Sequence, residues 1–299
     1  MTSTAQRTST AGDRVLAPFG VRAVPIVAHE RHGAYHVLRC ADQLGPRPQA
    51  GQFYMLAAVA RWGGGASQRP FVPRAFSVLR APAGSTELHF MLDDVGPGTK
   101  RLCELHPGDE LSILGPLGIG FAPPRDGRTP LLVGGGVGIA PLAIWQDQLG
   151  GDGRTGGATP TLYDVDSGER RQTTALLGFR DGEHARGAAL LTGAEIATDD
   201  GSAGHHGLVT ELLAAWLRDD RQVEVYACGP PAMLEAVRAL CAATDTPAQL
   251  ALESGMACGY GACFGCVVQT NDGYLRLCVD GPVLDAARLQ SALVPGATQ

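Results

Sequence analysis

Four cysteines near the C-terminus limit most strongly what this chain can fold into. Their spacing is Cys258-x4-Cys263-x2-Cys266, and eleven further residues separate Cys266 from Cys278. Clusters of two irons and two sulfides are held by this spacing, because one loop must present thiolates to both irons. A tight loop of this kind needs residues with positive φ, and its backbone amides turn toward sulfur. The glycines between the ligands are Gly259, Gly261 and Gly265. The pattern predicts a [2Fe–2S] cluster on the four cysteines.

A structural zinc site is the alternative. Zinc modules usually show paired C-x2-C knuckles, and the sequence has one such pair, Cys263 and Cys266. Clustered cysteines in a chain without a secretion signal favour a metal site over disulfides. We interpret Cys40, Cys103 and Cys241, which lack partners at ligand spacing, as small buried hydrophobic residues.

Composition argues against several classes of function. The net charge is −6 and no run of Lys and Arg occurs, which argues against a nucleic-acid surface. Residues 1–17 are rich in Ser, Thr and Ala without an apolar core, so we expect a flexible tail rather than a signal peptide. The most apolar stretch, residues 131–145, is broken by four glycines and Pro141, whereas a membrane span needs roughly 20 helical residues. We expect a soluble, cytoplasmic protein that binds neither nucleic acid nor membrane.

Residues 18–125 are predicted to form an antiparallel β-barrel domain. Six short β-type runs separated by turn residues are typical of a small barrel. The expected strands are Val21–Ala28, Tyr35–Arg39, Gln52–Val59, Arg74–Leu79, Glu87–Leu92 and Glu110–Leu114. One helix is expected, at Thr99–Leu105.

Residues 126–250 are predicted to form a doubly wound parallel sheet, because strands alternate with helices. The expected strands are Pro130–Val133, Thr174–Gly178, Glu195–Thr198 and Val223–Cys228. The expected helices are Ala140–Leu149, Glu183–Leu191, Leu208–Leu217 and Ala232–Ala243. The polar, glycine-rich segment Gly150–Arg171 is expected to be a surface insertion. Periodicity is lost from Glu253, so residues 251–299 are predicted to form a small module held by its metal.

Two motifs in the predicted barrel suggest a flavin site. Arg74-Ala75-Phe76-Ser77 starts a strand, where the planar fork of Arg suits a pyrophosphate and Ser77 suits a flavin ring edge. Gly96-Pro97-Gly98-Thr99 precedes a helix, whose free amides and positive dipole end favour an anion. Thr99 could instead be only the N-cap of that helix. The predicted FAD contacts are Arg74, Ala75, Phe76, Ser77, Met91, Leu92, Gly98 and Thr99.

Two further motifs suggest a nicotinamide site. A glycine turn, Gly134–Gly138, joins a strand to a helix and lets a pyrophosphate approach a helix N-terminus. It does not fit G-x-G-x-x-G, because Ile139 stands at the last glycine position, so a plain close-packed turn is the alternative. Cys228-Gly229-Pro230 ends another strand, where open α/β sheets bind ligands. The predicted NAD contacts are Gly135, Gly136, Gly138, Cys228, Gly229 and Pro230.

No catalytic residue is predicted. Hydride transfer between nicotinamide and flavin needs no acid–base pair from the protein at the reacting carbon. His205 and His206 lie in a loop between the segments Thr198–Ser202 and Gly207–Thr210. We interpret both histidines as solvated loop residues.

Together, residues 20–250 resemble the ferredoxin–NADP reductase superfamily in these flavin and nicotinamide motifs. Glu253–Val267 and Cys278–Leu284 resemble the cluster loop of the electron-transfer subunits of NAD-dependent (class 1B) dihydroorotate dehydrogenases. The resemblance implies FAD and one [2Fe–2S] cluster in this chain. It also implies a heterotetramer with a separate, FMN-containing dihydroorotate dehydrogenase catalytic subunit. Electrons would pass from FMN through the cluster and FAD to NAD+ in pyrimidine biosynthesis.

The resemblance leaves some features and functions open. Ala75 replaces the commoner Pro of the flavin motif, and the segment Gly150–Arg171 has no counterpart. NAD is inferred over NADP mainly from the resemblance, since Arg180 could contact a 2′-phosphate. One alternative function is a flavin and iron–sulfur NAD(P)H reductase subunit of a hydrogenase-like or sulfur-reducing complex. Another is a non-enzymatic protein with a zinc-stapled C-terminus and an empty barrel.

Overall fold

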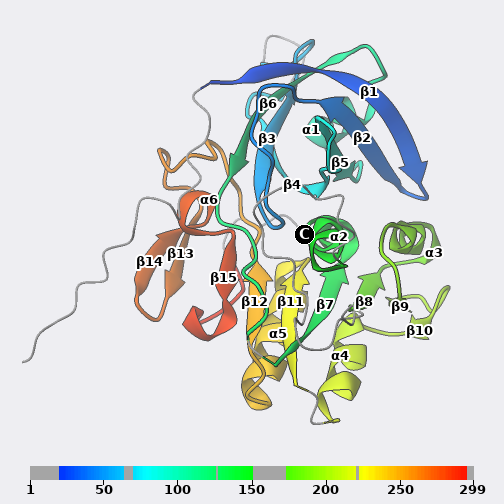
Figure 1. The fold of residues 1–299 in the computed structure, drawn as a ribbon, viewed down its shortest axis with the longest axis vertical. Helices are drawn as coiled ribbons and strands as arrows, with labels where there is room; N and C mark the ends of the chain where they lie inside the picture. The colour runs from blue at the N-terminus through cyan, green and yellow to red at the C-terminus, as the bar shows by residue number, and fades with distance from the viewer. Residues whose placement is uncertain (1–19, 64–69, 126, 151–172, 220–221, 295–299) are drawn as a thin grey trace, which may run out of the picture.

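A closed β-barrel and a seven-stranded sheet make up most of the molecule (Figure 1). The computed structural model describes residues 20–63, 70–125, 127–150, 173–219 and 222–294. The expected N-terminal tail, and all but the first residue of the expected insertion Gly150–Arg171, lie outside the described residues. Within the described part of the chain, no helix has the length and apolar character needed to cross a membrane.

The barrel is antiparallel, with the strand order β1-β2-β5-β4-β3-β6. Its strands are β1 (Arg22–His32), β2 (Tyr35–Ala41), β3 (Phe53–Ala58), β4 (Arg74–Arg80), β5 (Glu87–Leu92) and β6 (Glu110–Leu117). Inward and outward side chains alternate along β1, where Val24 and Ile26 are buried between exposed neighbours. This alternation is what a barrel filled by side chains requires. The six-stranded antiparallel barrel predicted from the sequence is confirmed.

One short helix, α1 (Pro97–Cys103), belongs to the barrel part of the chain. It begins two residues earlier than expected, with Gly96 as its N-cap. Thr99 is therefore not the N-cap: it stands three residues inside, and its hydroxyl accepts hydrogen bonds from the backbone amides of Val95 and Gly96, both at 3.0 Å. The pattern resembles a capping box that ties the helix to the loop before it.

The sheet has the order β10-β9-β8-β7-β11-β12-β15, and all its strands except β15 are parallel. Its strands are β7 (Thr129–Gly135), β8 (Thr174–Phe179), β9 (Ala194–Thr198), β10 (His205–His206), β11 (Val223–Cys228), β12 (Ala248–Ala251) and β15 (Val283–Asp285). The α-helices that follow its parallel strands are α2 (Ile139–Gly150), α3 (Gly182–Ala185), α4 (Val209–Leu217) and α5 (Pro231–Ala243). The predicted doubly wound parallel sheet is confirmed.

Three local details of the sheet differ from the expectation. The stretch expected to be one helix at Glu183–Leu191 is α3 followed by a 3₁₀ turn, η2 (Arg186–Leu190). His205 and His206 form a short edge strand, although both side chains are exposed as expected. The strand β12 was not expected, because a run of four residues gives little periodic signal.

The C-terminal segment is partly built into the sheet rather than separate from it. It contains a hairpin, β13 (Val267–Thr270) with β14 (Gly273–Arg276), then α6 (Leu277–Asp280), β15 and the turn η3 (Ala286–Arg288). β15 pairs antiparallel with β12 and so closes one edge of the sheet. The domain boundaries given above remain a prediction.

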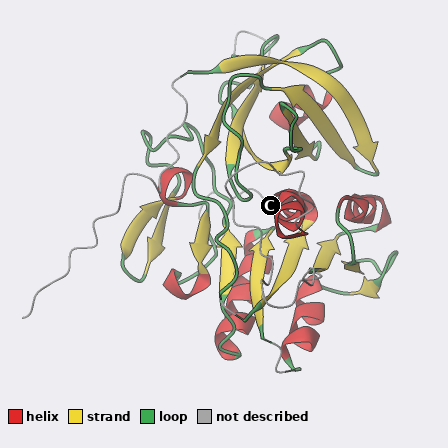
Figure 2. Cartoon of the chain, viewed as in Figure 1, coloured by secondary structure: helices red, strands yellow, loops and turns green. Residues whose placement is uncertain are grey.

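Helix α2 lies between the barrel and the sheet (Figures 1 and 2) and packs against β4 of the barrel. A hydrophobic core joins barrel residues such as Leu38 and Phe90 with Leu142 of α2 and Leu177 of β8. A second core joins Cys266 and Cys278 with residues of β7, β11, α4 and α5. These shared cores fix the barrel, the sheet and the cysteine segment against one another.

Candidate functional site

One cavity of about 1020 Å³ lies where the barrel, the sheet and the cysteine segment meet. Its lining comes from β4 and the end of β5, from the carboxyl ends of β7, β8, β9 and β11, and from the segment after β12. Ligand cavities in proteins usually measure roughly 300–1,000 Å³, so this one has room for an extended ligand. Most of the residues predicted from sequence line it: Arg74, Ala75, Phe76, Ser77, Met91, Thr99, Gly135, Gly136, Gly138, Cys228, Gly229 and Pro230.

Two predicted contacts are not part of the lining. Leu92 is fully buried in the hydrophobic core, so its side chain contributes to packing. Gly98 lies behind Arg74: a Cβ on Gly98 would stand 2.7 Å from Arg74 Nε. Gly98 thus lets the guanidinium approach the start of α1.

Arg74 occupies the barrel side of the cavity. Its guanidinium donates to the carbonyl of Val72 at 2.5 Å and lies 5.9 Å from the centre of the Trp62 ring. Among the described residues no acidic partner for Arg74 is found, so its charge remains available to an anion. The hydroxyl of Thr99 is committed to its helix cap, so Thr99 offers a ligand its backbone rather than its side chain. Arg74 beside these backbone amides fits a pyrophosphate group.

The turn after β7 meets the end of β11 on the sheet side of the cavity. Gly138 makes this approach possible, because a Cβ there would lie 2.4 Å from the carbonyl oxygen of Cys228. Gly136 adopts a φ of +55°, which glycine tolerates best. The two motifs that sequence analysis treated separately therefore line one wall, and α2 starts directly behind the turn. This wall fits a dinucleotide pyrophosphate at a helix N-terminus.

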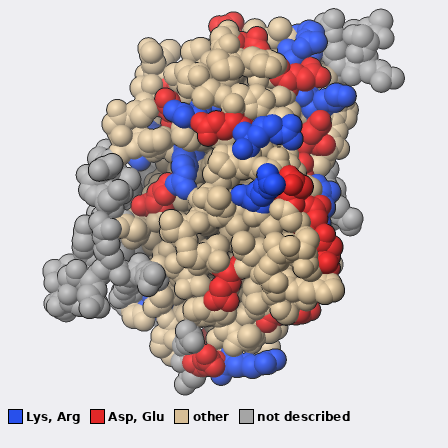
Figure 3. Space-filling model, turned by 90° about the vertical axis from the view of Figure 1, so that its right-hand side faces the viewer, with Lys and Arg blue, Asp and Glu red and all other residues tan. Residues whose placement is uncertain are grey.

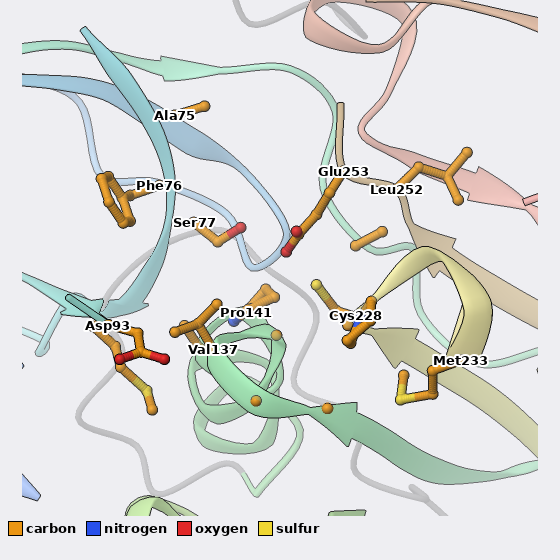
Figure 4. Close-up of a pocket in the computed structure, with 18 of the residues that line it drawn as sticks. Ala75, Phe76, Ser77, Asp93, Val137, Pro141, Cys228, Met233, Leu252 and Glu253 are labelled. Atoms are coloured by element: carbon orange, nitrogen blue, oxygen red, sulfur yellow. The ribbon is translucent and has the colours of Figure 1, made fainter. Parts of the chain in front are cut away.

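Glu253 and Ser254 also line the cavity and were not predicted. Figure 4 shows Ser77, Cys228 and Glu253 pointing into the same space. Burial raises the pKa of the Glu253 carboxyl to about 7. Burial, and secondarily the Glu253 charge, raises the pKa of the Cys228 thiol well above its ordinary value. The buried hydroxyl of Ser254 has no hydrogen-bond partner among the described residues, as expected for a group that a ligand completes.

The outer part of the cavity carries a charged network. Arg180, after β8, donates to Asp93 Oδ2, after β5, at 2.9 Å, and to His184 Nε2 at 2.9 Å. His184 Nδ1 in turn lies 2.7 Å from Asp181 Oδ1. This hydrogen bond is the main reason that the pKa of Asp181 lies below its ordinary value. The ion pair between Arg180 and Asp93 joins the sheet to the barrel.

The cysteine loop begins where the cavity ends. Met256 and Ala257 line the cavity and directly precede Cys258. Burial opposes ionisation of the Cys258 thiol, but hydrogen bonds from the backbone amides of Cys263, Tyr260 and Ala262 lower its pKa to about 6. The amides that sequence analysis expected to face sulfur are thus present. The thiol is poised to act as a thiolate ligand.

The glycines of the loop differ in one respect from the expectation. Gly259 and Gly261 have positive φ, at +82° and +85°, as expected. Gly265 does not, and the positive φ of +57° falls instead on Phe264. The amide of Gly265 donates to Cys263 Sγ at 3.4 Å, and the residue with positive φ directly precedes it.

The four cysteines interact as two pairs. Cys258 receives a hydrogen bond from the Cys263 thiol, and the Cys278 amide donates to Cys266 Sγ at 3.4 Å. Burial, followed by contact with Cys266, raises the pKa of Cys278 to about 12. Within the described part of the chain, no three Cys, His, Asp or Glu side chains group closely enough to hold one ion. Two pairs suit a two-iron cluster, in which each tetrahedral iron takes two thiolates and two sulfides, better than a single zinc ion.

Comparison with known proteins places this site in a family. Residues 253–290 match the model described as the iron–sulfur cluster binding domain of dihydroorotate dehydrogenase B. Curated relatives carry the name dihydroorotate dehydrogenase B (NAD(+)), electron transfer subunit. The relative from Geobacillus kaustophilus is 35% identical over 81% of this chain and 86% of its own length. The one from Desulforamulus reducens is 33% identical over 73% and 80%, and the one from Clostridium perfringens 30% over 81% and 87%.

Solved structures show the same fold. The NADH-dependent reduced ferredoxin–NADP oxidoreductase superimposes with a TM-score of 0.71 at 22% identity, covering 92% of each chain. A ferredoxin–NADP+ reductase from Neisseria gonorrhoeae gives a TM-score of 0.54 at 18% identity, covering 75% of this chain and 91% of its own. Identity at this level shows the fold alone. The match to the curated relatives goes further: this chain belongs to the family of electron transfer subunits of dihydroorotate dehydrogenase B (NAD(+)).

Proposed function

We propose that this chain binds FAD and one [2Fe–2S] cluster and passes electrons from the FMN of a catalytic partner to NAD+, in pyrimidine biosynthesis. The partner is a dihydroorotate dehydrogenase subunit, and the complex of the two kinds of subunit is a heterotetramer. The continuity of the cavity carries this proposal. The cavity runs from Arg74–Ser77 on the barrel, past the ends of β7 and β11, to the residues directly before Cys258.

The proposed assignment divides the cavity into two parts. Arg74 and the start of α1 bind the FAD pyrophosphate, and Ser77 faces the ring. Gly135–Gly138 and Cys228–Pro230 bind the nicotinamide nucleotide. In bound form FAD exchanges a hydride with nicotinamide and single electrons with the cluster, so it links two-electron and one-electron chemistry.

The residues of the chain position the flavin and the nicotinamide relative to each other. Hydride transfer needs reacting atoms about 3–3.5 Å apart. The barrel wall and the sheet wall are held at a fixed separation by α2, which packs against β4. The buried, protonated Cys228 thiol lines the sheet side of the cavity and helps to exclude water there.

The cluster segment supports the proposed partner surface. Cys263 is exposed, and the neighbouring aromatic side chains of Tyr260 and Phe264 are also largely exposed. Exposed aromatic residues are enriched at protein interfaces. A partner that covered them would bring its own redox group near the cluster. The proposal places the protein in the cytoplasm, where thiols stay reduced and cluster thiolates can be maintained.

Purified protein provides the test. The visible spectrum should show flavin and iron–sulfur absorbance, and the isolated chain should reduce ferricyanide with NADH but should not oxidise dihydroorotate. Adding an FMN-containing catalytic subunit should give the full reaction from dihydroorotate to NAD+. Turnover of dihydroorotate by the chain alone would contradict the division of labour. Co-purification with a different redox complex would favour the reductase alternative instead.

A further inference from the structure

The ends of four parallel strands define where the adenosine half of a bound nucleotide must lie. The order in the sheet is β9-β8-β7-β11. If the pyrophosphate lies at the turn after β7 and the nicotinamide at the end of β11, an extended dinucleotide continues in the opposite direction, over β8 and β9. Its adenosine ribose then meets Arg180 after β8 and Asp199 after β9, both of which line the cavity.

Arg180 is the residue at this end of the cavity that could bind a 2′-phosphate, the only group that distinguishes NADP from NAD. Its side chain is 57% exposed, so it is accessible to a ligand. An unpaired Arg here would favour NADPH, because guanidinium binds phosphate strongly.

Arg180 is not unpaired. Its Nη2 donates to Asp93 Oδ2 at 2.9 Å, and its Nε donates to His184 Nε2 at 2.9 Å. His184 accepts at Nε2 and contacts Asp181 through Nδ1 at 2.7 Å, which fits the neutral tautomer with its proton on Nδ1. The single guanidinium charge of Arg180 is therefore paired directly with the Asp93 carboxylate. It is linked through His184 to a second carboxylate, that of Asp181.

Besides Arg180 and His184, the charged side chains that line this end of the cavity among the described residues are Asp93 and Asp199. Asp199 lines the same end of the cavity, and Asp200 follows it, with its pKa held below the ordinary value by hydrogen bonds from Ser202. Arg186, the next cation along the chain, pairs with Glu183 at 3.3 Å. On the face of the molecule seen in Figure 3, acidic and basic side chains are interspersed rather than gathered by sign. A 2′-phosphate would bring its charge among these carboxylates.

We propose that Asp93 is a specificity-determining residue, which selects NADH over NADPH by holding Arg180 in an ion pair across the mouth of the cavity. The inference rests on the proposed function, because it requires the chain to use a nicotinamide nucleotide. Asp93 acts through Arg180: its carboxylate occupies the donor that a 2′-phosphate would need and adds a like charge beside it.

The test compares NADPH with NADH in FAD-loaded full-length protein, with ferricyanide as acceptor and rates normalised to bound flavin. In Asp93→Ala, the ratio of kcat/KM for NADPH to kcat/KM for NADH should rise by about tenfold, the effect of one freed charge-assisted contact. The double variant Asp93→Ala with Arg180→Ala should lose this gain. Competitive inhibition by 2′,5′-ADP should strengthen in Asp93→Ala while inhibition by 5′-ADP should not.

A matched control distinguishes a change in nucleotide specificity from a general loosening of the contact between the barrel and the sheet. Arg80 of β4 and Asp147 of α2 form another ion pair between the barrel and the sheet, and neither residue lines the cavity. Asp147→Ala should leave the NADPH to NADH ratio as it is in the wild type. An equal change in Asp147→Ala, or an unchanged ratio in Asp93→Ala, would overturn the proposal. Wild-type protein that oxidises neither nucleotide would overturn the proposed function instead.

Discussion

Glu253 and Cys228 point into the same part of the cavity, and burial raises the pKa of both side chains. The carboxylate of Glu253 helps to raise the pKa of the Cys228 thiol, and burial raises the pKa of Glu253 itself to about 7. The Cys228 thiol therefore stays protonated at neutral pH, whereas Glu253 changes its charge close to pH 7. Glu253 thus makes this part of the cavity sensitive to pH.

Stability should fall as pH rises through the titration range of Glu253. Its pKa in the folded protein, about 7, lies above the ordinary value of 4.5, so Glu253 contributes stability below about pH 4.5 that is lost as pH approaches 7. Because the side chain is half-buried, we expect a loss of about 1–3 kcal/mol rather than the full effect of the shift. Thermal unfolding at pH 5 and pH 7.5 should show a smaller pH effect in Glu253→Gln than in wild type. Equal pH effects would show that Glu253 ionises normally.

Replacing Cys263 with Ser should strongly reduce cluster assembly while leaving flavin bound. The variant removes a thiolate from the pair formed with Cys258, and hard hydroxyl oxygen is a poor ligand for this cluster. Iron content and visible absorbance measure the loss. Cys241→Ser, at a buried cysteine of α5 outside the loop, should retain iron. Zinc without iron in anaerobically prepared wild type would refute the cluster assignment.

Removing the guanidinium of Arg74 should weaken FAD binding. The lost charge-assisted contact is worth roughly 1.5–3 kcal/mol, or about 10- to 100-fold in Kd. Titration of the flavin-free protein with FAD gives this value. Arg47→Ala is the matched control, because Arg47 is a barrel arginine that donates to the Ala81 carbonyl and does not line the cavity. If both variants bind FAD like wild type, the flavin pyrophosphate lies elsewhere.

Adding one methyl group at Gly138 should damage the nucleotide site. Its Cβ would lie 2.4 Å from the Cys228 carbonyl oxygen, so the turn after β7 must move away from the end of β11, at a cost of about 1–3 kcal/mol. Gly138→Ala should raise KM for NADH and lower the unfolding temperature. Gly150→Ala, at the other end of α2 with open space around it, should do neither. Unaltered NADH kinetics in Gly138→Ala would place the nucleotide away from this turn.

Much of this architecture could be predicted because its signals are local. The spacing of Cys258 to Cys278, the strand starting at Arg74 and the glycine turn before Ile139 each depend on neighbours in sequence. Each of these motifs also meets a physical requirement of the ligand that it binds, such as thiolates for two irons or a close approach of the backbone to a pyrophosphate. The barrel and the parallel sheet followed from strand periodicity for the same reason.

The features that sequence did not reveal depend on contacts between distant segments. In the sequence Glu253 is an ordinary acidic residue, and it lines the cavity because it follows the end of β12. Asp93 and Arg180 are 87 positions apart and meet only in the folded chain. The three-residue strand β15 has no periodicity of its own and is defined by its pairing with β12. The positive φ falls on Phe264, a residue type that rarely adopts it, so composition pointed to Gly265 instead.

The strand β15 has a consequence for how the cysteine segment and the sheet depend on each other. It starts five residues after Cys278, and it forms one edge of the seven-stranded sheet by pairing with β12. Because β12 pairs in turn with β11, displacement of β15 from the sheet edge is transmitted over five residues to a cluster ligand. Opening of the sheet edge and disorder of the ligand loop are thus coupled mechanically, although the two belong to different parts of the site.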